Sequence, residues 1–235
     1  MTPTRCSRPR WCFPPRGAKP RPTASTCASR FPAYRGFSAS SVLGHVRARF
    51  FGPETGGILF NTPPSTAPFR IDQDQAFQQS THLQYQFPHS GPWMAFTWRY
   101  DSGMVASSVP TYAAALALTS DQQAAIGLFC GSVFATLASP IRSCSAPHFG
   151  ATRVFIPRLG TENDDLNPPR LAPRHVFDLA SGLDNVLHGD RYKLNLRFSV
   201  LNLGNTVALY NFLSDFSGTH FLAPRSYQAE VKFLF

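Results

Sequence analysis

The residues that most often carry chemistry are scattered along this chain. It has seven histidines and five cysteines, but no H-E-x-x-H or C-x-x-C spacing of the kind that marks a zinc site or a redox pair. Ser217, His220 and Asp215 are close in sequence, which does not indicate a triad, because triads are defined by geometry. The acidic run 162–165 is typical of a solvated loop rather than a cation site. We therefore expect no enzyme, no metal and no cofactor.

The elements that would position any site are β-strands with one apolar and one polar face. In the last ten residues, the odd-numbered positions are apolar or small and end on two aromatics, whereas the even-numbered positions are mostly polar. The odd-numbered, apolar set is Tyr227, Ala229, Val231, Phe233 and Phe235, and the even-numbered set is Ser226, Gln228, Glu230, Lys232 and Leu234. Period-2 alternation of this kind predicts a strand buried on one face. The same alternation recurs in segments 82–87, 94–100 and 192–200.

We expect an all-β fold, an antiparallel meander of about six long strands. Their ranges are 41–51, 80–88, 92–101, 174–186, 191–203 and 225–235. Such strands exceed the usual length of about five or six residues and suit a tilted membrane strand of about 9–11. The links are alternately long and short, which places every short turn at one end, as in an outer-membrane barrel. A short helix is expected near 118–126, where Thr119 or Ser120 can cap the N-terminus.

If the apolar residues of the alternating pattern face lipid, the pattern assigns each residue of a strand to one of the two faces of the sheet. The lipid-facing residues are then Phe96, Trp98, Leu194, Leu196, Phe198 and Val200, and the lumen-facing residues are Lys193, Asn195, Arg197, Glu230 and Lys232. A one-residue slip would turn Lys193 and Arg197 into lipid, at up to about 2–4 kcal/mol each at the midplane. The low charged content of 15% and the 21 phenylalanines fit this interpretation.

Cys130 and Cys144 lie in the long link 102–173, which would be extracellular in such a barrel. Because that environment is oxidising, a disulfide between them is expected, worth about 3 kcal/mol for a loop of this size. Two unpaired thiols are the alternative.

The basic character of the chain belongs to its first 35 residues. They hold eight of the 22 Lys and Arg residues and no Asp or Glu, whereas the net charge of the whole chain is +9. This Pro-rich segment shows no apolar periodicity, so we expect residues 1–35 to be a disordered tail. It has no apolar stretch of the kind found in a secretory signal. A basic nucleic-acid binder would have to depend on this tail alone, and we expect no nucleic-acid partner.

Several sequence blocks resemble a known family. The blocks are 81–87 (THLQYQF), 91–103 (GPWMAFTWRYDSG), 203–213 (LGNTVALYNFL) and 217–221 (SGTHF), together with the terminal Phe235. They are similar to the C-terminal barrel of TonB-dependent outer-membrane receptors, of the type with an N-terminal carboxypeptidase-regulatory-like domain. The resemblance covers about residues 40–235. It implies that Phe235, with Phe233 and Val231, forms the signal read by the barrel-insertion machinery.

The resemblance also implies parts that we do not find in this sequence. Receptors of this family have larger barrels, filled by an N-terminal plug with a TonB-contacting box. Because about six strands fall below the eight of the smallest membrane barrels, we expect an open piece of a barrel, unable to transport on its own. The expected partners are outer-membrane lipid, the insertion machinery, and the plug and remaining strands of a parent receptor in the bacterial outer membrane. The alternative is a soluble β-sandwich binding module.

Overall fold

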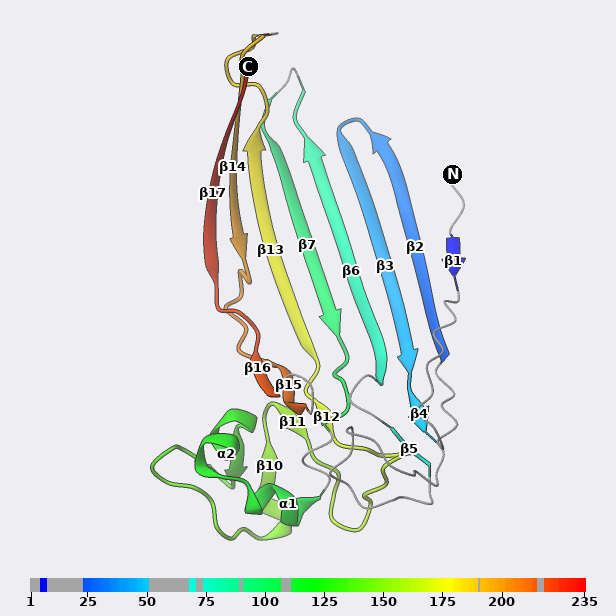
Figure 1. Cartoon of the computed structure of the whole chain (residues 1–235), viewed down its shortest axis with the longest axis vertical. Helices are drawn as coiled ribbons and strands as arrows, with labels where there is room; N and C mark the ends of the chain where they lie inside the picture. Colours follow the sequence, from blue (N-terminus) through cyan, green and yellow to red (C-terminus); the bar gives the residue numbers. More distant parts are fainter. Residues whose placement is uncertain are drawn as a thin grey trace.

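A large antiparallel sheet dominates the fold in the computed structural model, and a lobe of loops and short elements lies at one end of its strands (Figure 1). The structure describes residues 5–7, 23–50, 68–70, 74–88, 91–106, 111–189, 191–214 and 218–235. The strands of the sheet, in spatial order, are β1 (Arg5–Ser7), β2 (Thr23–Tyr34), β3 (Phe37–Arg47), β6 (Gln75–Gln86), β7 (Trp93–Asp101), β13 (Arg174–Leu183), β14 (Lys193–Leu201) and β17 (Ser226–Leu234). Spatial order follows chain order, so the sheet is an open meander.

The all-β, open antiparallel fold predicted from the sequence is confirmed. All six expected strands are present as β3, β6, β7, β13, β14 and β17. A further long strand, β2, falls inside the segment expected to be a disordered tail, so that prediction is wrong for residues 23–34. Strand β2 pairs with β3 over most of its length, and these backbone hydrogen bonds hold it in the sheet although most of its side chains are small. Residues 1–4 and 8–22 of the expected tail lie outside the described residues.

The short connections all lie at the end of the sheet opposite the lobe (Figure 1). The β2–β3 turn consists of Arg35 and Gly36, both at positive φ, which is the conformation of a tight type I′ hairpin. Short links also join β6 to β7 and β13 to β14, whereas long links join β3 to β6, β7 to β13 and β14 to β17. The alternation of short and long connections expected from the sequence is therefore present in the fold.

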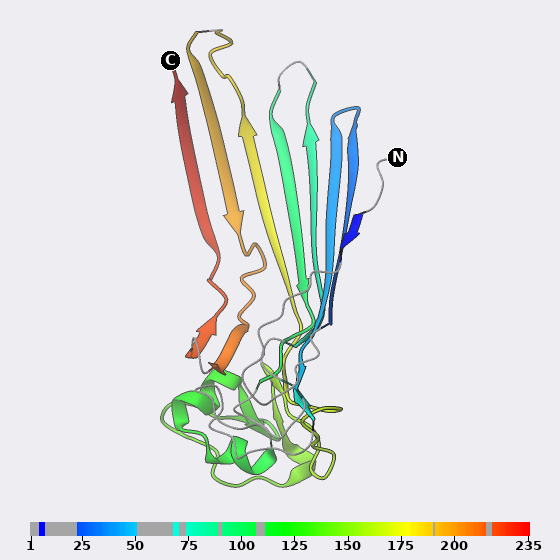
Figure 2. The same cartoon turned by 45° about the vertical axis from the view of Figure 1, so that its right-hand side comes forward.

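The lobe, which we call the cap, is formed by residues 111–171 together with the hairpin of β15 and β16 (Figure 2). Its elements are α1 (Tyr112–Ala117), α2 (Ser120–Ile126), β8 (Leu128–Cys130), β9 (Val133–Phe134), the 3-10 turn η1 (Ala146–His148), β10 (Phe149–Ala151), β11 (Val154–Phe155), β12 (Arg170–Leu171), β15 (Leu209–Ser214) and β16 (Gly218–Phe221). Helix α2 is the helix expected near 118–126. The short strands β4 (Arg49–Phe50) and β5 (Phe69–Arg70) pair with each other close to the cap.

The main hydrophobic core of the described residues lies in the cap and not on the sheet. It combines residues from α1, α2, β8, β11, β12 and β15 with their connecting loops, and its largest fully buried members are Ile126, Leu128, Leu171 and Leu209. No second sheet of comparable size is present among the described residues to cover either face of the large sheet. A sandwich, which needs two such sheets packed face to face, is therefore not what these residues form.

Candidate functional site: the two faces of the sheet

One face of the large sheet, here called the apolar face, carries an unbroken row of apolar residues across all seven long strands. Each member is the direct register partner of the next. The row is Phe31, Ala39, Leu83, Phe96, Leu179, Val200 and Tyr227. Because side chains on neighbouring strands that are in register point to the same side, the pairings place all seven on one face.

The six residues predicted to be lipid-facing all lie on the apolar face. Leu194, Leu196 and Phe198 pair with apolar residues of β17, and Phe96 and Trp98 pair with apolar residues of β13. Phe198 is half exposed, at 50%, and the partner of Leu196 on β17, Val231, is 71% exposed. Val200 differs, because it is buried. This face therefore presents apolar side chains outward with nothing in the described chain packed over many of them.

Aromatic contacts link strands on the apolar face near the cap. His175 lies between Tyr100 and Phe177, with ring centroids 4.7 and 6.4 Å away. The indole N–H of Trp98 donates to Nδ1 of His175 at 3.1 Å, so the indole nitrogen and one imidazole nitrogen are paired with each other. Phe96 stacks on Phe177 at 5.8 Å. At the opposite end of the sheet, Tyr192 stacks on Phe233 at 6.1 Å.

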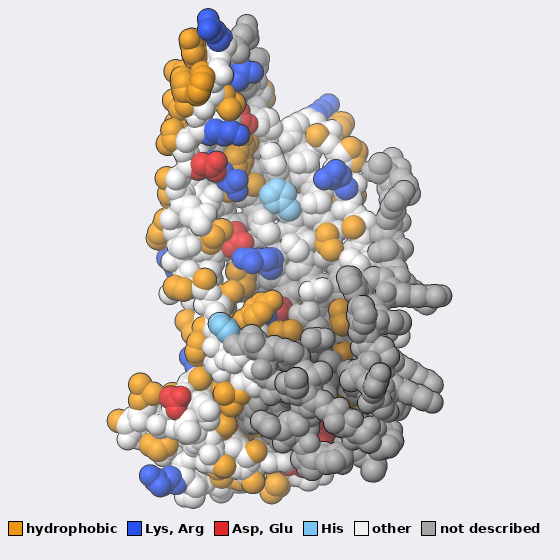
Figure 3. Space-filling view, in the orientation of Figure 1, with side chains coloured by type: hydrophobic (Ala, Val, Ile, Leu, Met, Phe, Trp, Pro, Cys, Tyr) orange, Lys and Arg blue, Asp and Glu red, His pale blue; other side chains and the backbone are white. Residues whose placement is uncertain are grey.

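The opposite face, here called the polar face, carries the residues predicted to face a lumen. Lys193, Asn195 and Arg197 alternate with the apolar-face residues of β14, and the register sets Lys232 opposite Asn195 and Glu230 opposite Arg197. All five therefore share one side of the sheet. Figure 3 views a face on which charged side chains gather over β13, β14 and β17 and uncharged ones over the middle of the sheet.

An open hollow of about 540 Å³ lies on the polar face across β6, β7, β13, β14 and β17. Its floor is a row of small residues, because Ala95, Ala180 and Ser199 are successive register partners. Larger side chains line it on both sides: Trp93 and Arg197 toward the short-turn end, and His82, Thr97 and Asp178 toward the cap. The hollow thus follows from alternating rows of small and large residues in register.

The two walls of the hollow are held by polar contacts. The guanidinium of Arg197 lies 5.7 Å from the ring centroid of Trp93, a cation–π arrangement. On the cap side, Arg99 forms an ion pair with Asp178 at 2.8 Å. His82 Nδ1 and the Thr97 hydroxyl are 3.0 Å apart. Amides, hydroxyls, one indole and both signs of charge therefore line the hollow, which can hydrogen-bond a polar molecule in water.

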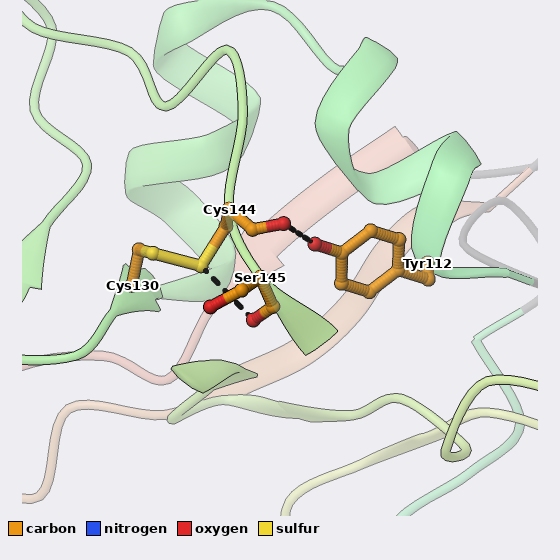
Figure 4. The surroundings of a disulfide bond; sticks show 4 residues. All are labelled: Tyr112, Cys130, Cys144 and Ser145. Carbon is orange, nitrogen blue, oxygen red and sulfur yellow. Dashed lines mark hydrogen bonds between the residues drawn. A yellow bond between two sulfur atoms is a disulfide. The ribbon is translucent and has the colours of Figure 1, made fainter. Parts of the chain in front are cut away.

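The cap contains the disulfide that the sequence predicts. Cys130 and Cys144 are joined, with their Cα atoms 5.8 Å apart. The hydroxyl of Tyr112 donates to the carbonyl of Cys144 (Figure 4), and its ring packs against Phe149 at 4.1 Å. The cross-link therefore ties the loop 131–143 to the aromatic side of the cap core.

Gln123 is a buried polar residue of the cap that the sequence analysis did not single out. Its side-chain amide donates to the carbonyls of Leu116, Leu118 and Ile141, and its oxygen accepts the N–H of Ile141 at 2.8 Å. It is fully buried. One side chain thus satisfies backbone groups from α1, the α1–α2 link and the loop before Cys144.

Thr119, one of the two residues predicted to cap α2, is its N-cap residue. The N–H of Thr119 donates to Oε1 of Gln122, as in a capping box. The Thr119 hydroxyl donates to the carboxylate of Asp121, and this hydrogen bond lowers the pKa of Asp121 from its ordinary value.

A network of ion pairs fixes the cap to the end of the sheet. Asp74, 1% exposed, accepts from Arg70 at 2.9 Å, from Arg170 and from the N–H of Ala48 at 3.1 Å. Asp101, at the end of β7, accepts from Arg174, which also donates to the carbonyl of Leu209. The partners are up to 96 residues apart in sequence. No local spacing could have indicated this network.

The residues expected to form the assembly signal lie on or after the edge strand β17. Among the strands that the structure describes, β17 has a neighbour on one side only, β14. Val231 and Phe233 face outward on the apolar face, and Phe235 follows the strand and is 93% exposed. The described structure thus leaves both the edge and the apolar side of this segment accessible.

The other candidate residues form no joint site. Among the described residues, no three His, Cys, Asp or Glu side chains are placed to hold a metal ion. His220 pairs with Asn211 Oδ1 at 3.1 Å, whereas Ser217 and Asp215 lie outside the described residues. No described helix is both long and apolar enough to cross a membrane. Comparisons with protein-family models, curated proteins and solved structures find no match to this chain.

Proposed function

We propose that this chain is a section of the wall of an outer-membrane β-barrel of the TonB-dependent receptor type, whose parent imports a solute across the outer membrane. The observation that carries the proposal is the apolar row across seven strands on one face, opposite a row of small and polar residues on the other. In water such a face would be covered by a second layer, whereas a barrel wall covers it with lipid.

Strand length and loop placement support the same proposal. The long strands have 9–12 residues, which fits a tilted crossing of about 9–11. Short turns at one end and a folded, disulfide-bonded cap at the other match the asymmetry of outer-membrane barrels, with their tight periplasmic turns and long extracellular loops. In this orientation the cap is extracellular, where a disulfide persists.

The open edges support a role as part of a larger barrel. An unpaired backbone N–H or C=O in the hydrocarbon core costs several kcal/mol, so membrane sheets close on themselves. Strand β17 has no neighbour beyond it among the described strands. We infer that further strands of a parent receptor close the barrel there, with a plug against the polar face and the insertion machinery acting on Phe233 and Phe235. Alone, the chain does not transport.

Two tryptophans on β7 provide the test of the lipid-facing side. Trp98 lies on the apolar face and Trp93 on the polar face. Two variants each keep one of these tryptophans, and the third tryptophan of the chain, Trp11, is replaced in both. In bicelles with bromine-labelled acyl chains, the Trp98-only variant (Trp11→Phe, Trp93→Phe) should be quenched. The matched Trp93-only variant (Trp11→Phe, Trp98→Phe) should be quenched by iodide in the water instead. Equal quenching of the two by lipid would overturn the proposed orientation.

Expression of the chain alone tests whether it is a piece of a barrel. We expect no heat-modifiable, protease-resistant band in the outer-membrane fraction of a Gram-negative host. Such a band would show that the chain closes a barrel by itself. A soluble monomer that needs no detergent, with Phe198 and Phe233 shielded from water, would instead support a soluble binding module.

A further inference from the structure

The hollow on the polar face has two walls that differ in how fully their polar groups are paired. On the cap side, one oxygen of the Asp178 carboxylate accepts from Arg99 at 2.8 Å, and the other accepts from the N–H of Asn202 at 2.9 Å. His82 Nδ1 and the Thr97 hydroxyl pair with each other. The cap-side wall therefore satisfies its own charges and hydrogen bonds within the protein, which leaves little there for a ligand.

The wall toward the short-turn end carries two opposite charges that have no ion-pair partner among the described residues. They belong to Arg197 and Asp184, which both line the hollow and take part in none of the ion pairs. Arg197 is the register partner of Gly182, and Asp184 follows Gly182 by two residues. Diagonal neighbours of this kind have Cα atoms about 7–8 Å apart. A cation and an anion therefore lie close together on this wall, each available to a ligand.

Contacts within the hollow hold the guanidinium of Arg197 in place. Its Nε donates to the hydroxyl of Ser199 at 3.3 Å, and its central carbon lies 5.7 Å from the ring centroid of Trp93. The indole of Trp93 lies against Gly182, whose lack of a side chain leaves room for it. Because Nε is the guanidinium nitrogen used in this way, the two terminal nitrogens are left to donate to a carboxylate as a fork.

We propose that the hollow binds a free α-amino acid with a large apolar side chain, such as phenylalanine. The ligand carboxylate accepts from Arg197 and the ligand ammonium group donates to Asp184, so one zwitterion pairs both charges. Its side chain lies over the small residues Ala95 and Ala180 of the floor, beside the indole of Trp93. A neutral saccharide would leave both charges unpaired, and a simple anion would leave one. The site lies wholly on the polar face, so it does not depend on what covers the apolar face.

Phenylalanine and two derivatives, each blocked at one end, test which charges are recognised. The full-length Trp93-only variant in bicelles is titrated with L-phenylalanine, N-acetyl-L-phenylalanine, L-phenylalaninamide and maltose, and the fluorescence of Trp93 reports binding. The buffer is at about pH 6, where free α-amino groups are protonated. Loss of one charged contact in an open site should weaken binding about fivefold, so each blocked compound should bind about fivefold more weakly than phenylalanine. Equal affinity for all three, tighter binding of maltose, or no response to phenylalanine would refute the proposal.

Two substitutions assign each charge to one end of the ligand. Arg197→Gln removes the partner of the carboxylate, so phenylalanine and phenylalaninamide should then bind equally. Asp184→Asn should likewise equalise phenylalanine and N-acetylphenylalanine. Lys193→Gln is the matched control, because Lys193 is a cation of the same strand and face but does not line the hollow, and it should leave both ratios as in the parent chain. A fivefold preference for phenylalanine over its amide that persists in Arg197→Gln would contradict the assigned contact.

Discussion

The indole of Trp93 lies against the backbone of Gly182 on the neighbouring strand. A Cβ at position 182 would be 2.6 Å from Cζ2 of Trp93 and 2.8 Å from the carbonyl oxygen of Leu196. Gly182 is also the register partner of Arg197, whose guanidinium approaches the same indole. The absence of a side chain at 182 is therefore what lets Trp93 form one wall of the hollow.

Gly182→Ala should consequently disturb this wall. The indole could rotate away, but the Leu196 carbonyl is backbone and cannot, so we expect a loss of about 1–3 kcal/mol of stability and a shift in Trp93 fluorescence. The measurement is denaturant unfolding of a Trp93-only variant. Gly204→Ala is the matched control, because its nearest contact would be an ordinary 3.4 Å to Thr206. An unchanged spectrum in Gly182→Ala would contradict the packing.

Gln123→Leu should destabilise the cap much more than its size suggests. Gln123 forms hydrogen bonds with three carbonyls and one N–H of the backbone. The change leaves these buried groups without partners. At about 1–3 kcal/mol for each unpaired buried group, even partial compensation by water leaves a loss of several kcal/mol. Gln122→Leu, on the same helix, breaks one bond near the surface and should cost about 1 kcal/mol or less. Hydrogen exchange of the Ile141 amide reports both effects.

The sequence alone predicts those strands in which successive residues differ strongly in polarity. In β14, charged or polar Lys193, Asn195 and Arg197 alternate with apolar residues, so parity alone predicts the face of every residue. Strand β2 gives little such signal, because Ser, Thr, Ala and Cys fill both faces of its first seven residues. Its place depends on its pairing with β3 across the Arg35-Gly36 turn, which no period-2 pattern within β2 contains.

The cap could be predicted only in its local parts. Thr119 and the polar first turn indicate α2, and the bond between Cys130 and Cys144 is predicted from the expectation that the link containing them is extracellular. The core, however, brings Leu128 and Leu171 together with Leu209 from a hairpin about 40 residues further along. Likewise the hollow requires Ala95, Ala180 and Ser199 to be in register, and register is a property of the folded sheet.

The Cys130–Cys144 bond should protect the cap. Reduction, or Cys130→Ser with Cys144→Ser, should lower cap stability by about 3 kcal/mol in the chain-entropy model. Arg142 lies inside the closed loop and is exposed, so trypsin can report the change. A nick after Arg142 in the oxidised chain should leave its fragments joined until reductant is added. Faster nicking after reduction is the expected result, and equal rates would show that the bond does not restrain the loop.

Asp74→Asn should be far more damaging than the same substitution at Asp178. Asp74 is buried and pairs with Arg70 and Arg170. Neutralising it removes the carboxylate partner of Arg170 and leaves Arg70 with Asp165 alone, at a cost of about 3–5 kcal/mol. Arg99, the partner of Asp178, is half exposed, and such a pair is worth about 1 kcal/mol or less. Thermal unfolding of the two variants measures the difference. Similar losses would mean that the network around Asp74 does not hold the cap to the sheet.

Helix α2 should lose stability in acid through Asp121. Its pKa is lowered, chiefly by the hydrogen bond from the Thr119 hydroxyl, so the folded state prefers the carboxylate. The resulting stabilisation is present above the unfolded pKa of about 3.9 and is lost as the pH falls through the lower, folded pKa. Thr119→Val removes the donor and should raise the pKa of Asp121 toward its ordinary value, which an NMR titration of the Asp121 carboxyl carbon measures. Thr119→Ser keeps the hydroxyl and should retain the low pKa, whereas a low pKa in Thr119→Val would assign the effect to the helix N-terminus instead.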